Sequence, residues 1–179
     1  TSLVNGLLAG KAAPISFYCE ERELWFCGSR QLIEELVLNL LSNSLAATPP
    51  DGSIRLMLQP RCGGAVITVQ DTGPGIPAEV RRTLFRPEEA LSSPSAEKGL
   101  GLGLITAKKA AELHGGNIVI ESKGGKGVRV TAVIRSQGDP AEIRGPAERR
   151  GVDVSAVLTE LSGVLPPSAY IPGPDTGED

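Results

Sequence analysis

Two asparagines, Asn39 and Asn43, stand four residues apart inside an apolar stretch with helical spacing. Asparagine is a poor residue for the middle of a helix because its side chain competes for backbone hydrogen bonds. The spacing puts both amides, with Glu35, in one stripe beside the apolar face. Either the amides satisfy buried backbone groups, or they line a pocket. In a pocket an amide oxygen suits Mg²⁺, which also keeps water and phosphate oxygens as ligands.

An aspartate ends the apolar run AVITVQ, and Asp71 is followed closely by Gly73 and Gly75. A carboxylate only accepts hydrogen bonds, so in a pocket it selects a ligand that donates, such as the amine of adenine rather than the carbonyl of guanine. The two glycines let the backbone approach a flat ring closely. The alternative interpretation is an ordinary aspartate between a strand and a turn.

A third group is the glycine-rich sequence KGLGLGL, which covers Lys98 to Leu104. Alternating glycines at the start of a helix expose amide hydrogens and the positive end of the helix dipole, and both suit a polyphosphate. The spacing matches neither the P-loop nor the dinucleotide-binding pattern. A flexible hinge is the alternative interpretation of this segment.

The surrounding patterns predict the elements that must position these groups. Apolar residues at helical spacing predict a helix over 30–48, ended by the turn sequence TPPDG, and a second helix from the glycine-rich segment to Glu112. A short helix is expected from Pro77 to Phe85. Strands are predicted at 14–19, 23–28, 53–59, 65–70, 117–122 and 128–135. The first two form a hairpin or lie near one another, and 53–59 and 65–70 form a second hairpin.

Taken in chain order, these segments resemble the ATP-binding catalytic domain of sensor histidine kinases, in the wider family that includes gyrase, the heat-shock chaperone ATPases and MutL. The resemblance runs from about Pro14 to Arg135. It rests on ELVLNLLSNSLAATPPDG (35–52) as the N box, DTGPGI (71–76) as the G1 box, LFRP (84–87) as the F box, and GLGLGLITAKKAAELHGG (99–116) as the G2 box with the segment after it.

The resemblance implies an α/β (α+β) two-layer sandwich of the Bergerat type, with a mixed sheet on one side and helices on the other. It also implies that ATP lies between the asparagine helix and a lid, with Asn43 binding Mg²⁺ and Asn39 supporting the phosphates. Asp71 would accept a hydrogen bond from the adenine amine. The remaining nucleotide-binding residues would be Gly73, Gly75 and Ile76 around the base, Phe85 as the lid anchor, and Lys98, Gly99, Leu100, Gly101, Leu102 and Gly103 near the phosphates.

Three positions depart from the family pattern. Ala46 stands where many of these kinases have a basic residue, and Leu100 and Val128 stand where hydroxyl side chains are common. Lys98 or Arg86 is expected to supply the missing positive charge. Asn39 takes the place of the glutamate that activates water in the ATP-hydrolysing members, and an amide cannot act as a general base. This favours a protein histidine kinase over a hydrolase.

The resemblance further implies that the phosphate acceptor is a histidine on a separate helical dimerisation domain, and that a response regulator is a partner. The single histidine, His114, is expected to pack or cap carbonyl groups at a helix end. Two other functions stay open. One is a serine-kinase relative that acts on a regulatory protein, and the other is a degenerate module that binds ATP or docks a partner.

Composition supports one domain with extensions. The chain has 179 residues, 40% of them hydrophobic, and a net charge of −3. With 3% aromatic residues and no basic surface, nucleic acid is not an expected partner. Cys19, Cys27 and Cys62 lack the spacing of a metal or redox site, so reduced, mostly buried thiols in a cytoplasmic protein are expected. Without an apolar run of membrane-spanning length, no direct membrane contact is expected, although the parent protein could be membrane-anchored.

The domain boundaries follow from the same patterns. Residues 1–13 are expected to be the end of an upstream helix or a linker, and residues 14–136 the ATP-binding domain. Residues 137–179 are rich in proline, glycine and acidic residues, as in a tail. Within this tail, the spacing predicts a short helix over 153–165.

Overall fold

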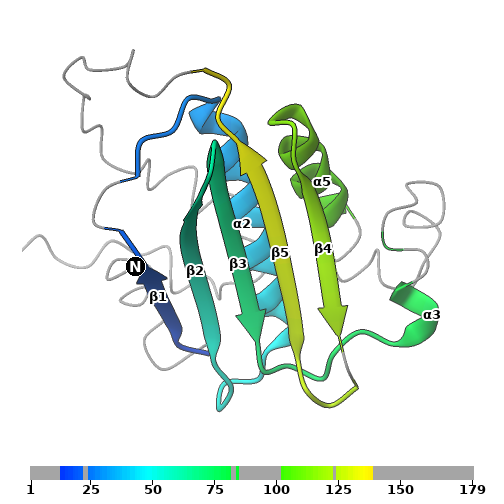
Figure 1. The fold of residues 1–179 in the computed structure, drawn as a ribbon. Helices are drawn as coiled ribbons and strands as arrows, with labels where there is room; N and C mark the ends of the chain where they lie inside the picture. The colour runs from blue at the N-terminus through cyan, green and yellow to red at the C-terminus, as the bar shows by residue number, and fades with distance from the viewer. Residues whose placement is uncertain (1–12, 22–23, 82–83, 85–101, 123, 139–179) are drawn as a thin grey trace, which may run out of the picture.

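The computed structural model describes residues 13–21, 24–81, 84, 102–122 and 124–138 (Figure 1). Its strands are β1 (Ile15–Cys19), β2 (Ile54–Arg61), β3 (Gly64–Asp71), β4 (Asn117–Ser122) and β5 (Val128–Arg135). They form one five-stranded sheet in the order β1-β2-β3-β5-β4. β1 pairs with β2 in parallel and the other three pairs are antiparallel, so the sheet is mixed, as predicted.

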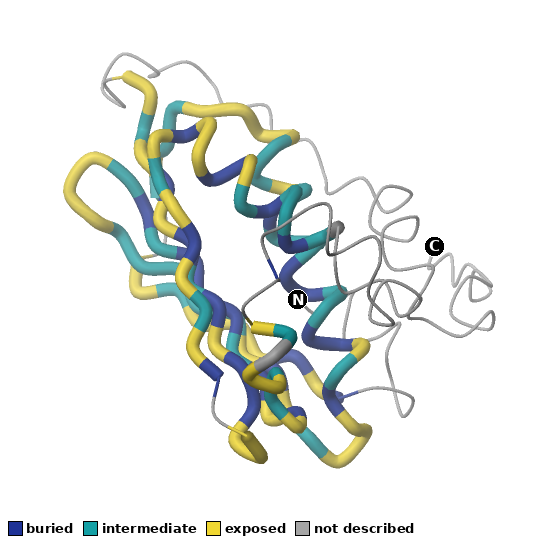
Figure 2. Tube along the Cα trace, turned by 90° about the vertical axis from the view of Figure 1, so that its right-hand side faces the viewer, coloured by how far each residue is buried: buried dark blue, intermediate teal, exposed yellow. Residues whose placement is uncertain are grey.

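Helices α2 (Arg30–Ala47) and α5 (Leu102–Leu113) lie together on one face of this sheet. Figure 2 shows the two layers edge-on, with buried residues concentrated where helices and sheet meet. The short helix α3 (Ala78–Arg81) follows β3. The predicted two-layer sandwich with helices on one face is therefore confirmed in the described part of the chain.

Helix α2 begins and ends where its sequence directs. Ser29 is the N-cap, and its hydroxyl accepts a hydrogen bond from the backbone N–H of Leu32. Thr48 is the C-cap, immediately before Pro49, which disfavours the helical state in the residue preceding it. The face predicted to be apolar packs against the sheet, where Leu36, Leu40, Leu41, Ser44 and Leu45 are buried.

The hairpin β2–β3 is confirmed, with a tight turn at Cys62 and Gly63, where Gly63 has φ 72°. Cys62 is exposed in this turn and Cys19 and Cys27 are half-buried, so the expectation of mostly buried thiols is wrong. Alternation along β3 sends Ala65, Ile67, Val69 and Asp71 into the core. Strand β3 lies in the middle of the sheet, with β2 and β5 on its two sides. The carboxylate that ends this strand is therefore held by a fully paired central strand.

The expected strand at 23–28 is wrong, and so is its pairing with 14–19. Residues 24–28 form no strand, and β1 pairs with β2, from which it is separated by the whole of α2. Leu24 and Phe26 pack against the core, while the backbone of Cys27 bonds to Ser136 and Gln137 beyond β5. Those bonds satisfy this backbone without a partner strand.

The predicted helix over 153–165 and the upstream segment 1–12 lie outside the described residues. No helix in the part of the chain that the structure describes is both long enough and apolar enough to cross a membrane.

Candidate functional site

Asp71 is the buried carboxylate at the end of β3, with 3% of its surface exposed. Its Oδ1 accepts hydrogen bonds from the backbone N–H of Gly73 at 2.9 Å and of Val128 at 3.1 Å. Its Oδ2 accepts one from the hydroxyl of Ser44 at 3.4 Å. A carboxylate has about four acceptor positions, so the long bond to Ser44 leaves Oδ2 able to accept from a further donor.

The loop after Asp71 is fastened to the turn between β4 and β5. Ile76 donates its backbone N–H to the hydroxyl of Ser122 at 2.7 Å, and the carbonyl of Pro74 accepts from Gly125 at 2.9 Å. Gly75 has φ 83°, a conformation that favours glycine. The end of β4 and the turn after it, which follow this loop by more than forty residues in sequence, therefore hold the loop in place.

Helix α2 packs against the other side of this loop. A methyl group on Gly73 would lie 2.9 Å from the carbonyl oxygen of Ala47 and 3.0 Å from Oδ1 of Asp71. Such distances are shorter than ordinary contacts, so the loop lies as close to the end of α2 as glycine permits. Close packing, rather than its backbone angles, therefore requires glycine at position 73.

Asn39 and Asn43 face the first turn of α5. A methyl group on Gly103 would lie 2.7 Å from Oδ1 of Asn39 and 3.4 Å from Nδ2 of Asn43. Nδ2 of Asn39 donates to the carbonyl of Glu35 at 2.9 Å, which places Glu35 and Asn39 in one stripe, as predicted. The two amides therefore lie between α2 and the start of α5.

The amide of Asn43 is the unusual group of the site. Its Nδ2 is buried and has no hydrogen-bond partner in the described part of the chain. A buried, unpaired amide costs about 1–3 kcal/mol, so its presence calls for a partner that the protein itself does not provide. Because the two ends of an amide are nearly interchangeable in shape, this side chain can offer a donor or an oxygen ligand at the same place.

The structure thus brings together several residues predicted from sequence. Asp71, Gly73, Gly75 and Ile76 form one end of the arrangement, and Asn39, Asn43 and Gly103 form the other. Leu102 begins α5. Phe85, Lys98, Gly99, Leu100 and Gly101 lie outside the described residues.

Sequence reasoning missed three contributors. Ser44 lies among the buried apolar residues of α2, yet its hydroxyl bonds to Asp71. Ser122 ends β4 and holds the loop at Ile76. Val128 lacks a hydroxyl, as noted from sequence, but it supplies a backbone N–H to Asp71. A serine directly after Asn43, among the apolar positions of the predicted helix, was the one sequence signal that could have found Ser44.

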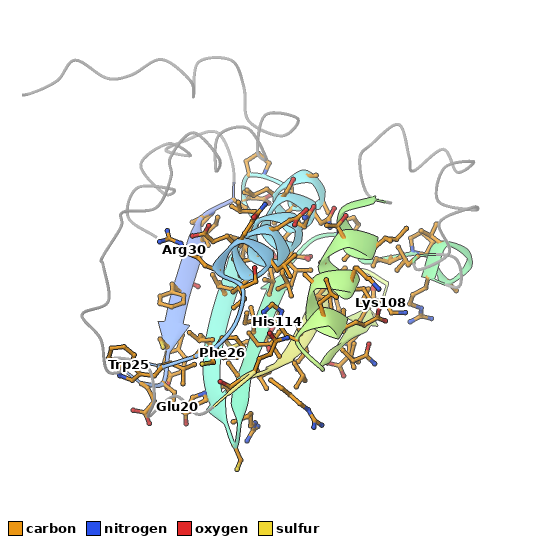
Figure 3. All side chains as sticks on the ribbon, turned by 90° about the horizontal axis from the view of Figure 1, so that it is seen from above. Glu20, Trp25, Phe26, Arg30, Lys108 and His114 are labelled. Atoms are coloured by element: carbon orange, nitrogen blue, oxygen red, sulfur yellow. The ribbon has the colours of Figure 1, made fainter. Side chains whose placement is uncertain are left out.

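His114 has a structural role at the opposite end of α2. It is 1% exposed, its Nε2 accepts from the backbone N–H of Ser29 at 3.1 Å, and its Nδ1 lies 2.8 Å from the carbonyl of Ala110. Its ring also contacts Phe26, with centroids 5.8 Å apart (Figure 3). The expectation that His114 packs at a helix end is confirmed, because it joins the end of α5 to the N-cap of α2.

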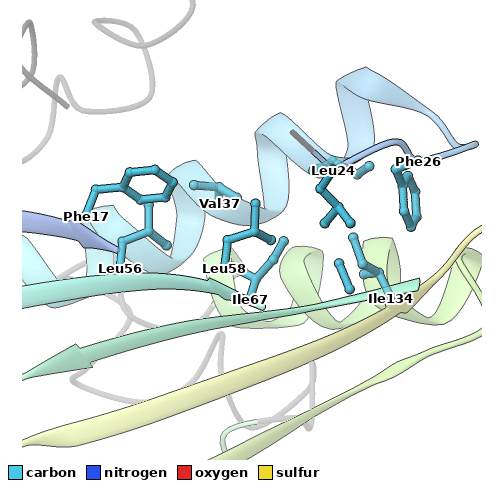
Figure 4. A pocket seen from close by; sticks show the side chains of 10 residues that line it. Phe17, Leu24, Phe26, Val37, Leu56, Leu58, Ile67 and Ile134 are labelled. Carbon is cyan, nitrogen blue, oxygen red and sulfur yellow. The ribbon is translucent and has the colours of Figure 1, made fainter. Parts of the chain in front are cut away.

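An apolar cavity of about 200 Å³ lies away from these groups, between β1, β2 and α2 (Figure 4). Phe17, Leu24 and Val37 are among the side chains that line it. None of the residues predicted to bind a nucleotide contributes to it, and ligand pockets are commonly 300–1,000 Å³. This cavity is therefore not the candidate site.

The fold is that of histidine kinase catalytic domains. The catalytic domain of histidine kinase ThkA superposes with a TM-score of 0.59 at 23% identity, covering 75% of this chain and 90% of that domain. At this identity the match describes the fold alone. It confirms the two-layer α/β architecture inferred from the sequence motifs.

The family follows from the sequence comparisons. Residues 28–138 match the model of the histidine kinase-, DNA gyrase B-, and HSP90-like ATPase family, and the chain belongs to this family. It is 38% identical over 122 residues to the C4-dicarboxylate transport sensor protein DctB of Rhizobium meliloti, covering 67% of this chain and 19% of DctB. It is 40% identical over 110 residues to the histidine protein kinase DivJ of Caulobacter vibrioides, covering 61% of this chain and 18% of DivJ. The chain spans less than a fifth of the length of these two relatives.

Proposed function

We propose that this chain binds Mg-ATP between α2 and α5 and serves as the phosphate-donating half of a sensor histidine kinase. The observation that carries the proposal is that α2 serves both ends of the site. Ser44 contacts Asp71, and the preceding residue, Asn43, faces Gly103 with an unpaired amide. Helix α2 therefore connects Asp71, which suits the base of a nucleotide, to Asn43, which suits phosphate and a metal ion.

At the end of the site formed by β3 and the loop after it, Asp71 would recognise adenine. The exocyclic amine of adenine donates a hydrogen bond, whereas guanine presents a carbonyl at the same place. Oδ2 of Asp71 has acceptor capacity left, while Oδ1 is occupied by two backbone N–H groups. Gly73, Gly75 and Ile76 would then lie along the ring.

At the second end, the proposal assigns the phosphates to the start of α5. The first N–H groups of a helix have no partner inside the helix and attract anions. Asn39 and Asn43 lie beside Gly103 and would support the phosphate oxygens. Phe85 would anchor the lid, and Lys98, Gly99, Leu100, Gly101 and Leu102 would complete the phosphate-binding segment.

The donor set at this end fits Mg²⁺ with Asn43 as a protein ligand. In the described part of the chain, no group of three His, Cys, Asp or Glu side chains could hold a metal ion. Mg²⁺ usually takes one or two protein oxygens and completes its shell with water and phosphate. When bound, the ion would neutralise charge on the transferring phosphoryl group.

The chain's own residues favour transfer to an external nucleophile. The amide of Asn39 faces Gly103 and cannot deprotonate water, so the site lacks this route to hydrolysis. His114 is buried with both ring nitrogens engaged, which excludes it as the acceptor. We therefore assign the acceptor histidine to a separate dimerisation domain and the next transfer to a response regulator, with both reactions in the cytoplasm.

Radiolabelled ATP tests this function. The full chain with Mg²⁺ and [γ-³²P]ATP should label a histidine-containing dimerisation domain supplied in trans, and the label should be lost in acid and kept in alkali. An acid-stable label on serine would instead favour the serine-kinase alternative. Absence of ATP binding by calorimetry at millimolar nucleotide would favour the docking module.

A further inference from the structure

The sheet face that points away from α2 and α5 has no helix on it among the described elements (Figures 1 and 2). We call this the outer face. The strand register defines its rows: Ser16, Arg55, Gln70, Arg129 and Glu121; Tyr18, Met57, Thr68, Thr131 and Val119; Gln59, Val66, Val133 and Asn117; and Arg61, Gly64 and Arg135.

Five of the nine side chains in the two middle rows of the outer face are apolar, and we call these five the apolar band: Tyr18, Met57, Val66, Val119 and Val133. Tyr18 is 56% exposed, Val119 is 55% exposed and Val133 is 37% exposed, which are high values for large apolar side chains. Met57 and Val66 lie between them and are half-buried. In the part of the chain that the structure describes, half of the exposed large apolar residues belong to this band. Exposed apolar side chains that gather on one face in this way are a feature of interaction sites.

Arginines border the band at both ends of the strands. Arg55 and Arg129 lie in the row on one side, where Arg129 contacts Glu121 at 3.8 Å. Arg61 and Arg135 lie on the other side, where both are opposite Gly64. No described carboxylate forms an ion pair with Arg55, Arg61 or Arg135. The outer face therefore suits a partner that is apolar along its centre and acidic at its edges.

The chain's own tail has this chemistry. Strand β5 ends at Arg135, and residues 139–179 follow the last described residue, Gly138. After Arg150 the sequence contains five acidic residues and no basic one. The spacing of Val154, Val157, Leu158, Leu161 and Leu165 predicts an apolar helix face. Asp153 and Glu160 are seven residues apart and would lie in one row beside that face.

We propose that residues 153–165 bind the outer face as a helix lying across the strands. Thirteen helical residues span about 20 Å, and five strands spaced about 4.8 Å apart span about 19 Å, so the two lengths match. The connection over 139–152 reaches at most about 50 Å when extended, which is more than the crossing of the sheet requires. The helix would then cover the apolar band, with Asp153 and Glu160 near the arginines that border one side of it.

This contact would make the domain a three-layer structure with the nucleotide site on the far side of the sheet. The inference does not depend on kinase activity or on ATP binding. Failure of the proposed function would leave it intact, and its own failure would leave the nucleotide site intact.

A photo-crosslinker placed in the band tests the proposal. In the full chain, Val119 is replaced by p-benzoyl-L-phenylalanine, the protein is illuminated at low micromolar concentration, and linked peptides are identified by mass spectrometry. The expected product has the mass of one chain and joins position 119 to residues 153–165. A link to any other segment, a product of two chains, or no linked product would overturn the proposal.

Matched variants in the same background separate docking from chance contact. Leu158→Glu with Leu161→Glu should lower the yield of the linked peptide at least tenfold, because the apolar face is lost. Ala156→Glu with Thr159→Glu adds the same charge on the opposite side of the predicted helix and should change the yield by less than twofold. Equal losses in both double variants would also overturn the proposal. The same crosslinker at Leu113, which is exposed at the end of α5, should not reach the tail.

Discussion

The hydroxyl of Ser44 lies 3.4 Å from Oδ2 of Asp71, and both side chains are buried. Asn43 directly precedes Ser44 in α2, and Ser44 is hydrogen-bonded to Asp71. These two links fix the distance between the unpaired amide of Asn43 and the carboxylate of Asp71. The two ends of the proposed site are thus spaced by the geometry of α2 rather than by a flexible connection. Variants of these residues should separate the contributions of base, phosphate and metal.

Asp71→Asn should weaken ATP binding by about 1.5–3 kcal/mol, the range for hydrogen bonds to charged groups, which is roughly 10–150-fold in Kd. The replacement keeps one oxygen for Gly73 and Val128 but puts the NH2 group of an amide, which donates, where Oδ2 accepts. Isothermal titration calorimetry with ATP and GTP measures this, and the preference for ATP should shrink. The exposed Asp51→Asn is the matched control. An affinity within twofold of the parent chain would contradict the role of Asp71.

Asn43→Ala should reduce the gain in ATP affinity that Mg²⁺ produces, by roughly tenfold if one metal ligand is lost. Binding without metal should fall less, because phosphate contacts at α5 remain. Titrations with Mg²⁺ and with EDTA give the two affinities, and Gln31→Ala, exposed in the first turn of α2, serves as control. Equal losses with and without metal would remove Asn43 as a ligand.

Gly103→Ala should separate stability from nucleotide binding. Alanine stabilises a helix by about 1 kcal/mol relative to glycine. This gain offsets the cost of moving the Asn39 amide, whose Oδ1 would lie 2.7 Å from the new methyl group. The free energy of unfolding in urea should therefore change by less than about 1 kcal/mol. ATP affinity should fall roughly fivefold because the displaced amide no longer faces the phosphate. Gly124→Ala, which would meet no atom within 4 Å, should change neither quantity. Unchanged ATP affinity in Gly103→Ala would exclude this end of α5 from the site.

His114→Ala should destabilise the domain by about 2–4 kcal/mol, since it leaves a cavity and an unpaired N–H at Ser29. The free energy of unfolding in urea measures this loss. The neighbouring Leu113→Ala, at 49% exposure, should change it by less than about 0.5 kcal/mol. Labelling of a histidine domain in trans should persist below the unfolding range, and its complete loss in a folded His114→Ala protein would argue for a functional role.

Sequence patterns predicted the elements around the site because local rules decide them. The apolar stripe of α2, its stop before Pro49, and the alternation in β3 are each set by neighbouring residues. The segment 23–28 shows the limit of such rules. Its alternating apolar residues resemble a strand, but Leu24 and Phe26 pack on the core while Cys27 bonds to the chain beyond β5, more than a hundred residues later. No local pattern encodes that contact.

The polar residues of the proposed site stand out in the sequence, whereas the residues that contact and support them do not. Asp71 and the two asparagines stand out because their types are unfavourable where they occur. Ser44 and the N–H of Val128 do not, since a serine in a helix and a backbone group in a strand are ordinary until the fold brings them to Asp71. Sequence reasoning therefore finds residues of unusual type more readily than the ordinary residues that the fold brings into contact with them.

In the strand order β1-β2-β3-β5-β4, strand β3 has two strands on each side, β2 and β1 on one and β5 and β4 on the other. Opening of a sheet starts at its edges, so β1 and β4 should fray and exchange their amide hydrogens well before the centre does. The geometry around Asp71 would then survive partial loosening of the domain by heat or by a pulling force on either edge. The proposed selectivity for adenine should consequently be among the last properties that this domain loses as it unfolds.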